Sequence, residues 1–293
     1  MTINDWSLKT GEPRVGEVIS KLKSQLSNRS ESPSLDSQVL VAHICGQNRA
    51  WVLAHPEAIL TPRQQETLGA MVSLLEAGKP LPYVLGRWEF YGLDFRINTE
   101  VLIPRPETEL MVEQAIKWLQ AHPKRRTAAD IGTGSGCIAV SLAVHITDLH
   151  VTGTDIARTA LEVASANAEK HNVTARVKFL HADMLPTNLP NCDLICANLP
   201  YIPTRTLEGL DVYGREPTLA LDGGPDGLSL IRRLLPQAFR VLSSKGLLLL
   251  EIEATQGKTG VNLAREYFPE AQVDLLPDLA GRNRLIRIET FTV

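Results

Sequence analysis

The stretch Ala128-Ala-Asp-Ile-Gly-Thr-Gly-Ser-Gly-Cys-Ile-Ala-Val140 decides the fold of this chain. It begins as a short, largely apolar strand and ends in apolar residues that suit a helix. Three glycines lie between the two, where the backbone must turn sharply and where a ligand can approach the N–H groups of a helix N-terminus. This order of strand, glycine loop and helix predicts the first unit of an α/β sheet.

The alternation of strand and helix continues to the C-terminus, which predicts a parallel sheet with helices on both faces. The last two strands have no helix between them, so we expect an antiparallel hairpin at the sheet edge. The fold class expected is therefore α/β, with a Rossmann-like, seven-stranded mixed sheet. The expected strands are 127–131, 150–154, 176–181, 193–197, 246–252, 272–276 and 284–290. The expected helices are 135–145, 158–171, 228–243 and 257–267.

The first part of the chain shows helical spacing of apolar residues instead. Thr61-Pro62 is typical of a helix start, with Thr at the N-cap and Pro at the first helical position. Lys79-Pro-Leu-Pro-Tyr83 ends the helical pattern, and Trp88–Ile97 alternates like a β-hairpin. We therefore expect three segments: a small helical domain at 1–79, a linker with a hairpin at 80–104, and the sheet domain at 105–293.

Composition limits the classes of protein that the chain can be. Of the 293 residues, 44% are hydrophobic and 22% charged, as in an ordinary globular protein. The N-terminus has no basic stretch followed by an apolar core, and no apolar run reaches the roughly 20 residues that span a bilayer. We expect a cytoplasmic protein that does not bind membranes. The net charge of −3 disfavours a grip on nucleic-acid phosphates.

The cysteines and histidines do not predict a metal site. Cys45, Cys137, Cys192 and Cys196 lie in apolar surroundings without a paired CxxC motif, which favours buried thiols. The seven histidines show no ligand spacing. We expect neither a disulfide framework nor a bound metal.

Two details of the glycine loop indicate its ligand. The spacing is GxGxG rather than GxGxxG, because residue 137 is Cys, and Asp130 precedes the first glycine. A pyrophosphate would be repelled by this carboxylate, so a dinucleotide is disfavoured. Both details favour the S-adenosylmethionine loop of class I methyltransferases. The expected cofactor-binding residues here are Gly132, Thr133, Gly134, Ser135 and Gly136.

The next two strand ends carry further candidates for cofactor binding. Asp155 ends the second strand, about 20 residues after the loop, where an acid can accept hydrogen bonds from both ribose hydroxyls. It could equally cap the helix that follows. Asp183 could accept from an adenine amino group while Met184 packs on the ring, although a simple turn fits both residues as well.

The fourth strand is followed by Asn198-Leu-Pro-Tyr201, which suits recognition of a planar amide or amine. The Asn198 side-chain oxygen and the Leu199 carbonyl can accept two N–H bonds, while the Tyr201 ring covers the face of the group. Pro200 favours an extended backbone at Leu199. Asn198 is also a candidate contact of the cofactor. The alternative is an ordinary turn after a strand.

Nearly the whole chain resembles the bacterial release factor glutamine methyltransferases. The most specific resemblance is Val101-Leu-Ile-Pro-Arg-Pro-Glu-Thr-Glu109, and one residue departs from the family pattern, since Leu199 replaces the second residue of Asn-Pro-Pro-Tyr. The other matching stretches are Gly78–Tyr83, Gly86–Phe90, Asp130–Gly136, Asn198–Ile202, Glu216–Leu221, Gly224–Leu228, and Glu251 with Gln256-Gly257.

The resemblance implies methyl transfer from S-adenosylmethionine to the side-chain amide nitrogen (N5) of the Gln in the Gly-Gly-Gln motif of peptide-chain release factors. It also implies that residues 1–79 recognise the substrate, that Asn198 and Tyr201 are the catalytic residues, and that Asn198 to Tyr201 bind the substrate. We expect a monomer. Glu251 and Glu253 lie at a strand end, where solvated carboxylates are common, and neither is assigned a catalytic part.

Two other functions stay open. The Asn-Leu-Pro-Tyr spelling resembles the motif of ribosomal RNA adenine dimethyltransferases, so an amino-group (adenine N6-type) methyltransferase acting on ribosomal RNA or DNA is the main alternative. Tyr201 would then stack on an extruded base. The second alternative is a non-catalytic binding module that keeps the methyltransferase fold. The intact glycines, Asp155, Asn198 and Tyr201 disfavour this non-catalytic alternative.

Overall fold

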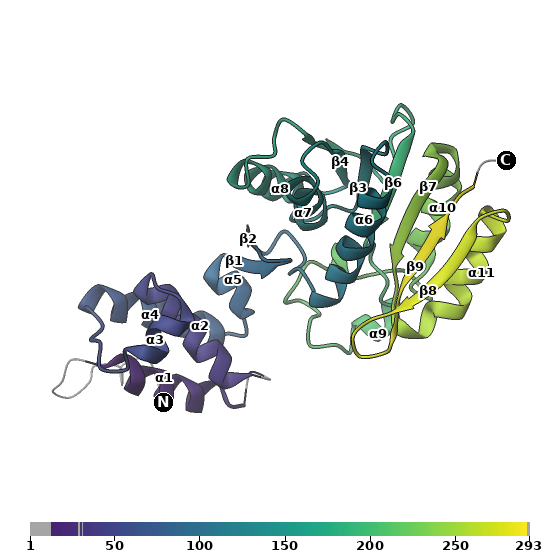
Figure 1. The fold of residues 1–293 in the computed structure, drawn as a ribbon. Coiled ribbons are helices and arrows are strands. Elements are labelled where there is room, and N and C mark those ends of the chain that lie inside the picture. The colour runs from purple at the N-terminus through teal and green to yellow at the C-terminus, as the bar shows by residue number, and fades with distance from the viewer. Residues whose placement is uncertain (1–12, 29, 31, 292–293) are drawn as a thin grey trace. The chain divides into compact units, whose positions relative to one another are not determined.

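The computed structural model describes residues 13–28, 30 and 32–291, so the first residues of the predicted helical domain lie outside the described part. The chain divides into two compact units, Met1–Gly86 and Arg87–Val293, which are described separately below (Figure 1). No helix within the described ranges is long and apolar enough to cross a membrane.

The first unit is helical, as predicted. Its helices pack around buried leucines, among them Leu22, Leu40 and Leu68. The predicted helix start at Thr61 is confirmed by a capping box, in which Gln64 N–H donates to Thr61 Oγ1 and Thr61 N–H donates to Gln64 Oε1. The helices are α1 (Val15–Leu26), α2 (Pro33–Cys45), α3 (Arg49–Ala54), α4 (Pro62–Glu76) and α5 (Leu81–Leu85).

The segment 80–104, predicted as a linker, is divided between the two units. Leu81 in α5 joins the apolar core of the first unit. The hairpin of β1 (Arg87–Phe90) and β2 (Leu93–Arg96) joins the second, because Asn167 donates to the Arg96 carbonyl (2.9 Å) and accepts from the Arg96 N–H (2.7 Å). A boundary set by such tertiary contacts is not visible in a local Pro-rich pattern.

The second unit contains the predicted seven-stranded mixed sheet. Its strand order is β5-β4-β3-β6-β7-β9-β8, and the final hairpin, β8 with β9, is antiparallel as predicted. The strands are β3 (Thr127–Ile131), β4 (His150–Asp155), β5 (Val177–His181), β6 (Cys192–Ala197), β7 (Leu242–Glu251), β8 (Gln272–Pro277) and β9 (Asn283–Glu289).

Strand β7 begins at Leu242, earlier than the predicted residue 246. Leu242 pairs with Cys192, but the next pair is Leu247 with Leu194, so the pairing is irregular between them. Lys245 lies in this interval with φ 57°. The polar residues Ser243 to Lys245 therefore form a bulge in the strand, where the sequence pattern predicted a helix to residue 243 and no strand before residue 246.

Helices cover both faces of the sheet (Figure 1). On one face lie α6 (Glu109–Ala121), α7 (Cys137–His145) and α8 (Arg158–Lys170), and on the other α10 (Ser229–Val241) and α11 (Gly257–Tyr267). The core beneath them contains fully buried residues such as Ile195, Leu248 and Ile286. Four short helical segments lie between these elements: Pro106–Thr108 precedes α6, α9 (Thr204–Leu207) and Thr218–Ala220 lie between β6 and α10, and Ala254–Gln256 follows β7.

The strand order reverses direction at the centre of the sheet, between β3 and β6. These neighbours are parallel, with Ile131 beside Ala197 at their carboxyl ends. From β3 the chain adds β4 and β5 toward one edge of the sheet. It then returns to place β6 on the other side of β3, and the remaining strands extend toward the opposite edge. In open α/β sheets the loops diverge at such a point and leave a crevice for ligands. The fold therefore places a crevice where the glycine loop and Asn198 both begin.

Candidate active site

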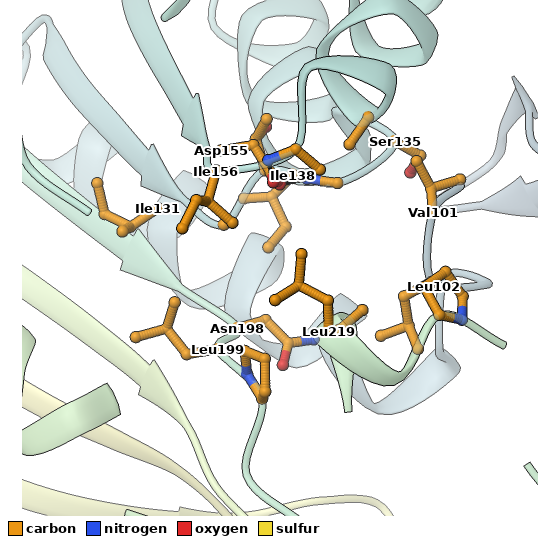
Figure 2. Close-up of a pocket in the computed structure, with 18 of the residues that line it drawn as sticks. Val101, Leu102, Ile131, Ser135, Ile138, Asp155, Ile156, Asn198, Leu199 and Leu219 are labelled. Atoms are coloured by element: carbon orange, nitrogen blue, oxygen red, sulfur yellow. Dashed lines mark hydrogen bonds between the residues drawn. The ribbon is translucent and has the colours of Figure 1, made fainter. Parts of the chain in front are cut away.

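A cavity of about 230 Å³ opens at the carboxyl ends of β3, β4 and β6. This volume is far more than one water needs. In Figure 2, Asn198 and Leu199 lie along one side of the cavity, with Asp155 and Ile138 opposite them and Val101 and Leu102 on a third side. Its lining is mostly apolar with a few polar groups, which is typical of a small-molecule site.

The glycine loop forms one wall of the cavity. Gly132, Gly134 and Gly136 have φ values of 70°, 54° and 77°, which side chains disfavour. A Cβ on Gly132 would lie 3.1 Å from Leu199 Cδ2, so this glycine lets the loop lie directly against the Asn198 segment. Gly136 is not part of the lining. A Cβ there would meet Ala164 at 3.1 Å, so Gly136 instead allows close packing of α8.

Asp130 supports the loop from below and does not line the cavity. It is fully buried and accepts from the Thr133 hydroxyl (2.6 Å) and from the Ala139 N–H (3.2 Å). Burial raises its pKa to about 7, against the effect of these two hydrogen bonds and with a smaller contribution from Asp155. The acid that precedes the first glycine thus ties the loop to the first turn of α7.

Asp155 lies at the cavity wall, and its carboxylate organises the backbone around it. Gly134 N–H donates to Asp155 Oδ2 and Ala157 N–H donates to Oδ1, each at 2.9 Å. The N-cap residue of α8 is Ala157, so Asp155 is not the helix cap that the sequence also allowed. A carboxylate has about four acceptor sites, so two remain for a ligand's hydroxyls.

Asp183 and Met184 both line the cavity beyond the end of β5. Met184 is buried, whereas the Asp183 carboxylate forms an exposed ion pair with Arg233 of α10. Arg233 lines the cavity too. The structure thus brings both predicted residues to the site, with the carboxylate already paired.

The two ends of the Asn198 side-chain amide have different hydrogen-bonding environments. Its Nδ2 donates to Thr108 Oγ1 at 2.9 Å, and in the described part of the chain no donor reaches its Oδ1. The next residue, Leu199, buries its side chain, and no backbone N–H of the described residues reaches its carbonyl. Two acceptor oxygens therefore remain available, from a side chain and from the adjoining backbone. Pro200 completes this wall.

Tyr201 is not among the residues that line the cavity. Its hydroxyl donates to Glu251 Oε1 at 3.3 Å. Burial raises the pKa of Tyr201, and the nearby Glu251 carboxylate raises it further. The tyrosine is thereby a neutral donor that anchors the segment to the end of β7.

Glu251 is only 1% exposed, so the prediction of a solvated carboxylate at this strand end was wrong. Burial raises its pKa to about 7. Hydrogen bonding with the Thr108 and Tyr201 hydroxyls and the charge of Arg284 oppose the rise, while Glu107 adds to it. Periodicity marked residue 251 as a strand end but carried no information on which loops cover that end.

The backbone around Tyr201 is fixed by contacts that leave no room for side chains. Gln256 Nε2 donates to the Tyr201 carbonyl at 2.8 Å. A Cβ on Gly223 would lie 2.7 Å from the Pro200 carbonyl oxygen, and one on Gly227 would lie 2.1 Å from that of Tyr201. The glycine-rich segment after α9 therefore packs directly against the backbone of Pro200 and Tyr201.

Gly227→Ala should destabilise the second unit by about 2–5 kcal/mol, since left-handed strain and a clash with the Tyr201 carbonyl add together. Gly281→Ala is the matched control: its φ of 74° is similar to the 75° of Gly227, but no atom of the described residues lies within 4 Å of its added Cβ. Chemical denaturation of both variants separates strain from clash. Equal losses in the two would show that the Gly227 contact is not tight.

A strap formed by residues 216–220 covers one side of the cavity. Arg105 forms an ion pair with Glu216, and Ile103 N–H donates to Glu216 Oε2 at 3.1 Å. Glu216 is largely buried, and the residues after it, Pro217 and Leu219 among them, line the cavity. The Pro-Arg-Pro-Glu-Thr-Glu run contributes Pro104, Arg105 and Thr108 to the lining of the cavity.

Four residues that shape the site were not assigned individual roles from the sequence: Thr108, Glu216, Glu251 and Gln256. All of them fall in stretches that carry the resemblance, which was the available signal. Each of them contacts a partner that lies 50 or more residues away in the sequence. Thr108 and Asn198, for example, are 90 residues apart.

Comparison with known proteins gives family matches to both units. The family model of the PrmC N-terminal domain matches residues 17–86, and that of the methyltransferase small domain matches residues 108–208. The first range ends at the observed unit boundary.

Relatives that match this chain over most of its length are described as release factor glutamine methyltransferases. The release factor glutamine methyltransferase of Moorella thermoacetica is 42% identical over 272 residues, which cover 92% of this chain and 95% of that protein. That of Coxiella burnetii is 36% identical over 274 residues, covering 93% of this chain and 97% of that protein.

Among solved structures, the hMettl16 catalytic domain in complex with MAT2A 3′UTR hairpin 6 superposes with a TM-score of 0.55. The match covers 82% of this chain and 86% of that one at 16% identity. This likeness shows that the fold is a methyltransferase fold and no more.

Proposed function

The chain belongs to the release factor glutamine methyltransferases, and from this we propose how its own residues carry out the reaction. The enzyme transfers a methyl group from S-adenosylmethionine to the side-chain amide nitrogen of a glutamine in a peptide-chain release factor. The observation that carries our account is the pair of acceptor oxygens, Asn198 Oδ1 and the Leu199 carbonyl, at the wall of the cavity.

The lining of the cavity fits S-adenosylmethionine. The glycine loop lies at the N-terminus of α7, and Gly132, which has no side chain, lets the loop lie directly against Leu199 at the edge of the cavity. Asp155 keeps acceptor capacity for ribose hydroxyls, while Ile156 and Met184 offer apolar surface for an adenine ring. We assign cofactor binding to Gly132–Ser135, Asp155, Asp183 and Met184, with Asn198 at the boundary between cofactor and substrate. Gly136 acts by packing.

The amide nitrogen of glutamine is a poor nucleophile because its lone pair is delocalised into the carbonyl group. When bound, the cofactor supplies an electrophilic sulfonium methyl group. Asn198 Oδ1 and the Leu199 carbonyl accept the two N–H bonds of the substrate amide, which orients the nitrogen and favours positive charge on it. The nitrogen can release a proton after transfer, so the site needs no strong general base.

Asn198, Leu199 and Pro200 form the substrate wall in this proposal. Tyr201, predicted to cover the amide face, is assigned a supporting part: its hydroxyl bond to Glu251 and the Gln256 bond to its carbonyl fix the backbone that presents the Leu199 oxygen. The family is described by its Asn-Pro-Pro-Tyr pattern, and any residue at 199 supplies the carbonyl.

We assign substrate recognition to the helical first unit, because the match to the PrmC N-terminal domain covers it separately from the methyltransferase match. We further propose a cytoplasmic monomer without a direct nucleic-acid partner. The net charge of −3 supports the last point, since phosphate binding depends on clustered positive charge.

Label transfer tests the function directly. The protein is incubated with methyl-labelled S-adenosylmethionine and either purified release factor or ribosomal RNA. We expect label in the release factor, and peptide mass spectrometry should place it on one glutamine. Label in the RNA alone would favour the adenine-modifying alternative, and label in neither would favour a binding module.

Leu199→Pro should change turnover by less than about threefold. The substitution retains the carbonyl, and Leu199 already precedes Pro200, whose ring favours extended backbone. Initial rates with release factor as substrate measure the effect. A loss of tenfold or more in a folded variant would mean that the carbonyl of residue 199 follows a different path from that described here.

A further inference from the structure

Asn198 can serve the reaction in only one orientation of its amide. The oxygen can accept an N–H bond from a substrate amide, whereas the NH2 end would oppose it with another donor. The two orientations have nearly the same shape, so packing alone does not select between them. The selection must come from the group that the other end of the amide contacts.

That group is the Thr108 hydroxyl, 2.9 Å from Asn198 Nδ2. Thr108 is only 2% exposed, so solvent does not compete for its oxygen. A hydroxyl is both donor and acceptor, and it favours the NH2 end of Asn198 only if its own proton points elsewhere. A second acceptor near Thr108 is therefore needed to make the orientation of Asn198 unique.

Glu251 supplies this second acceptor. The Thr108 hydroxyl lowers the pKa of the Glu251 carboxyl against the larger effect of burial, which indicates that the two groups lie close together. One carboxylate oxygen, Oε1, accepts from the Tyr201 hydroxyl, while Oε2 is buried, has no hydrogen-bond partner among the described residues and so keeps its acceptor capacity. A carboxylate is acceptor-only when ionised, so it draws the hydroxyl proton away from Asn198.

We propose that Thr108 and Glu251 are positioning residues for methyl transfer: Glu251 orients the Thr108 hydroxyl, and Thr108 turns the oxygen of Asn198 toward the substrate amide. Through its other oxygen, Glu251 also holds Tyr201, so one buried carboxylate sets both ends of the acceptor segment. This inference rests on the proposed function. An apolar residue at 251 would remove the carboxylate acceptor from the buried Thr108 hydroxyl and from the partly buried Tyr201 hydroxyl.

Thr108→Val removes the hydroxyl and keeps the shape of the side chain. With release factor as substrate, kcat should fall about 10-fold to 100-fold, because the Asn198 amide loses its preferred orientation. The Kd for S-adenosylmethionine should stay within about twofold, as Thr108 acts through Asn198. Thr108→Ser restores the hydroxyl and should recover most of the rate. Thr154→Val is the control, since the Thr154 hydroxyl is buried and has no hydrogen-bond partner among the residues that the structure describes.

Glu251→Gln tests the second step. The amide has one acceptor oxygen in place of two, so either Thr108 or Tyr201 would face an NH2 group, and kcat should fall about tenfold or more when assayed at pH 8, where the wild-type carboxyl, with its pKa of about 7, is ionised. The double variant with Thr108→Val should be no more than about twofold slower than the slower single variant, because both changes break one chain of contacts.

The outcomes separate this inference from the function itself. If wild-type protein does not label release factor, the proposed function fails. If it does, but Thr108→Val matches Thr154→Val, or Thr108→Ser is as slow as Thr108→Val, the positioning role is wrong. The positioning role would also be wrong if the loss of kcat in the double variant equalled the product of the losses in the two single variants. Loss of cofactor affinity in Thr108→Val would show that Thr108 supports the cavity as a whole.

Discussion

Asn198→Ala should slow methyl transfer to release factor by about 10²–10³-fold, the range found when one preorganised polar contact to a transition state is removed. The substitution deletes the Oδ1 acceptor and leaves only the Leu199 carbonyl to hold the amide. Single-turnover kinetics with saturating cofactor measure the chemical step. The Kd for S-adenosylmethionine should change little, since the ribose and adenine contacts assigned to Asp155 and Met184 remain.

The matched control is Asn191→Ala. Asn191 is exposed and lies just before β6, at the opposite end of the strand from Asn198. This control should retain the wild-type rate and the wild-type melting temperature. If Asn198→Ala turned over as fast as Asn191→Ala, Asn198 would have no part in orienting the substrate amide.

Asp155→Ala should weaken binding of S-adenosylmethionine by at least about 100-fold. Two hydrogen bonds from ribose hydroxyls to a charged acceptor contribute about 1.5–3 kcal/mol each, and every 1.4 kcal/mol is a factor of ten. The variant also loses the bonds from the Gly134 and Ala157 N–H groups, which loosens the loop. Isothermal titration calorimetry measures the affinity, and the methyl acceptor is not needed.

Asp148→Ala is the control for Asp155→Ala, because Asp148 is an exposed carboxylate that pairs with Arg126 and does not line the cavity. It should bind the cofactor as the wild type does. An Asp155→Ala variant that melts normally and binds the cofactor with wild-type affinity would contradict the assignment of Asp155 to the ribose.

The elements around the glycine loop were predictable because their signals are local. Strand β3, the loop and α7 follow from one short stretch, and the strand ends that carry Asp155 and Asn198 follow from the alternation of strand and helix. The parallel order of β3 and β6 then brings their loops together. Fold class and the main cavity residues could therefore be derived before any contact was known.

The supports of the site could not be derived in this way. The burial of Glu251 depends on Tyr201 and Thr108, which come from other parts of the chain. Tyr201 lies outside the lining of the cavity for the same reason, since its hydroxyl binds the distant Glu251. The boundary at Gly86 likewise depends on Asn167, which binds Arg96 from 71 residues away. Local patterns predict strand ends and helix starts, whereas contacts between distant segments decide which polar groups are buried.

The most direct test of the account is a crystal structure of this protein with S-adenosylhomocysteine and a methylated release factor. The account predicts that the modified amide nitrogen lies within about 3.2 Å of at least one of its two acceptors, Asn198 Oδ1 and the Leu199 carbonyl, with the methyl group directed at the cofactor sulfur. An amide bound by other groups, with both of these oxygens turned away from it, would contradict the account.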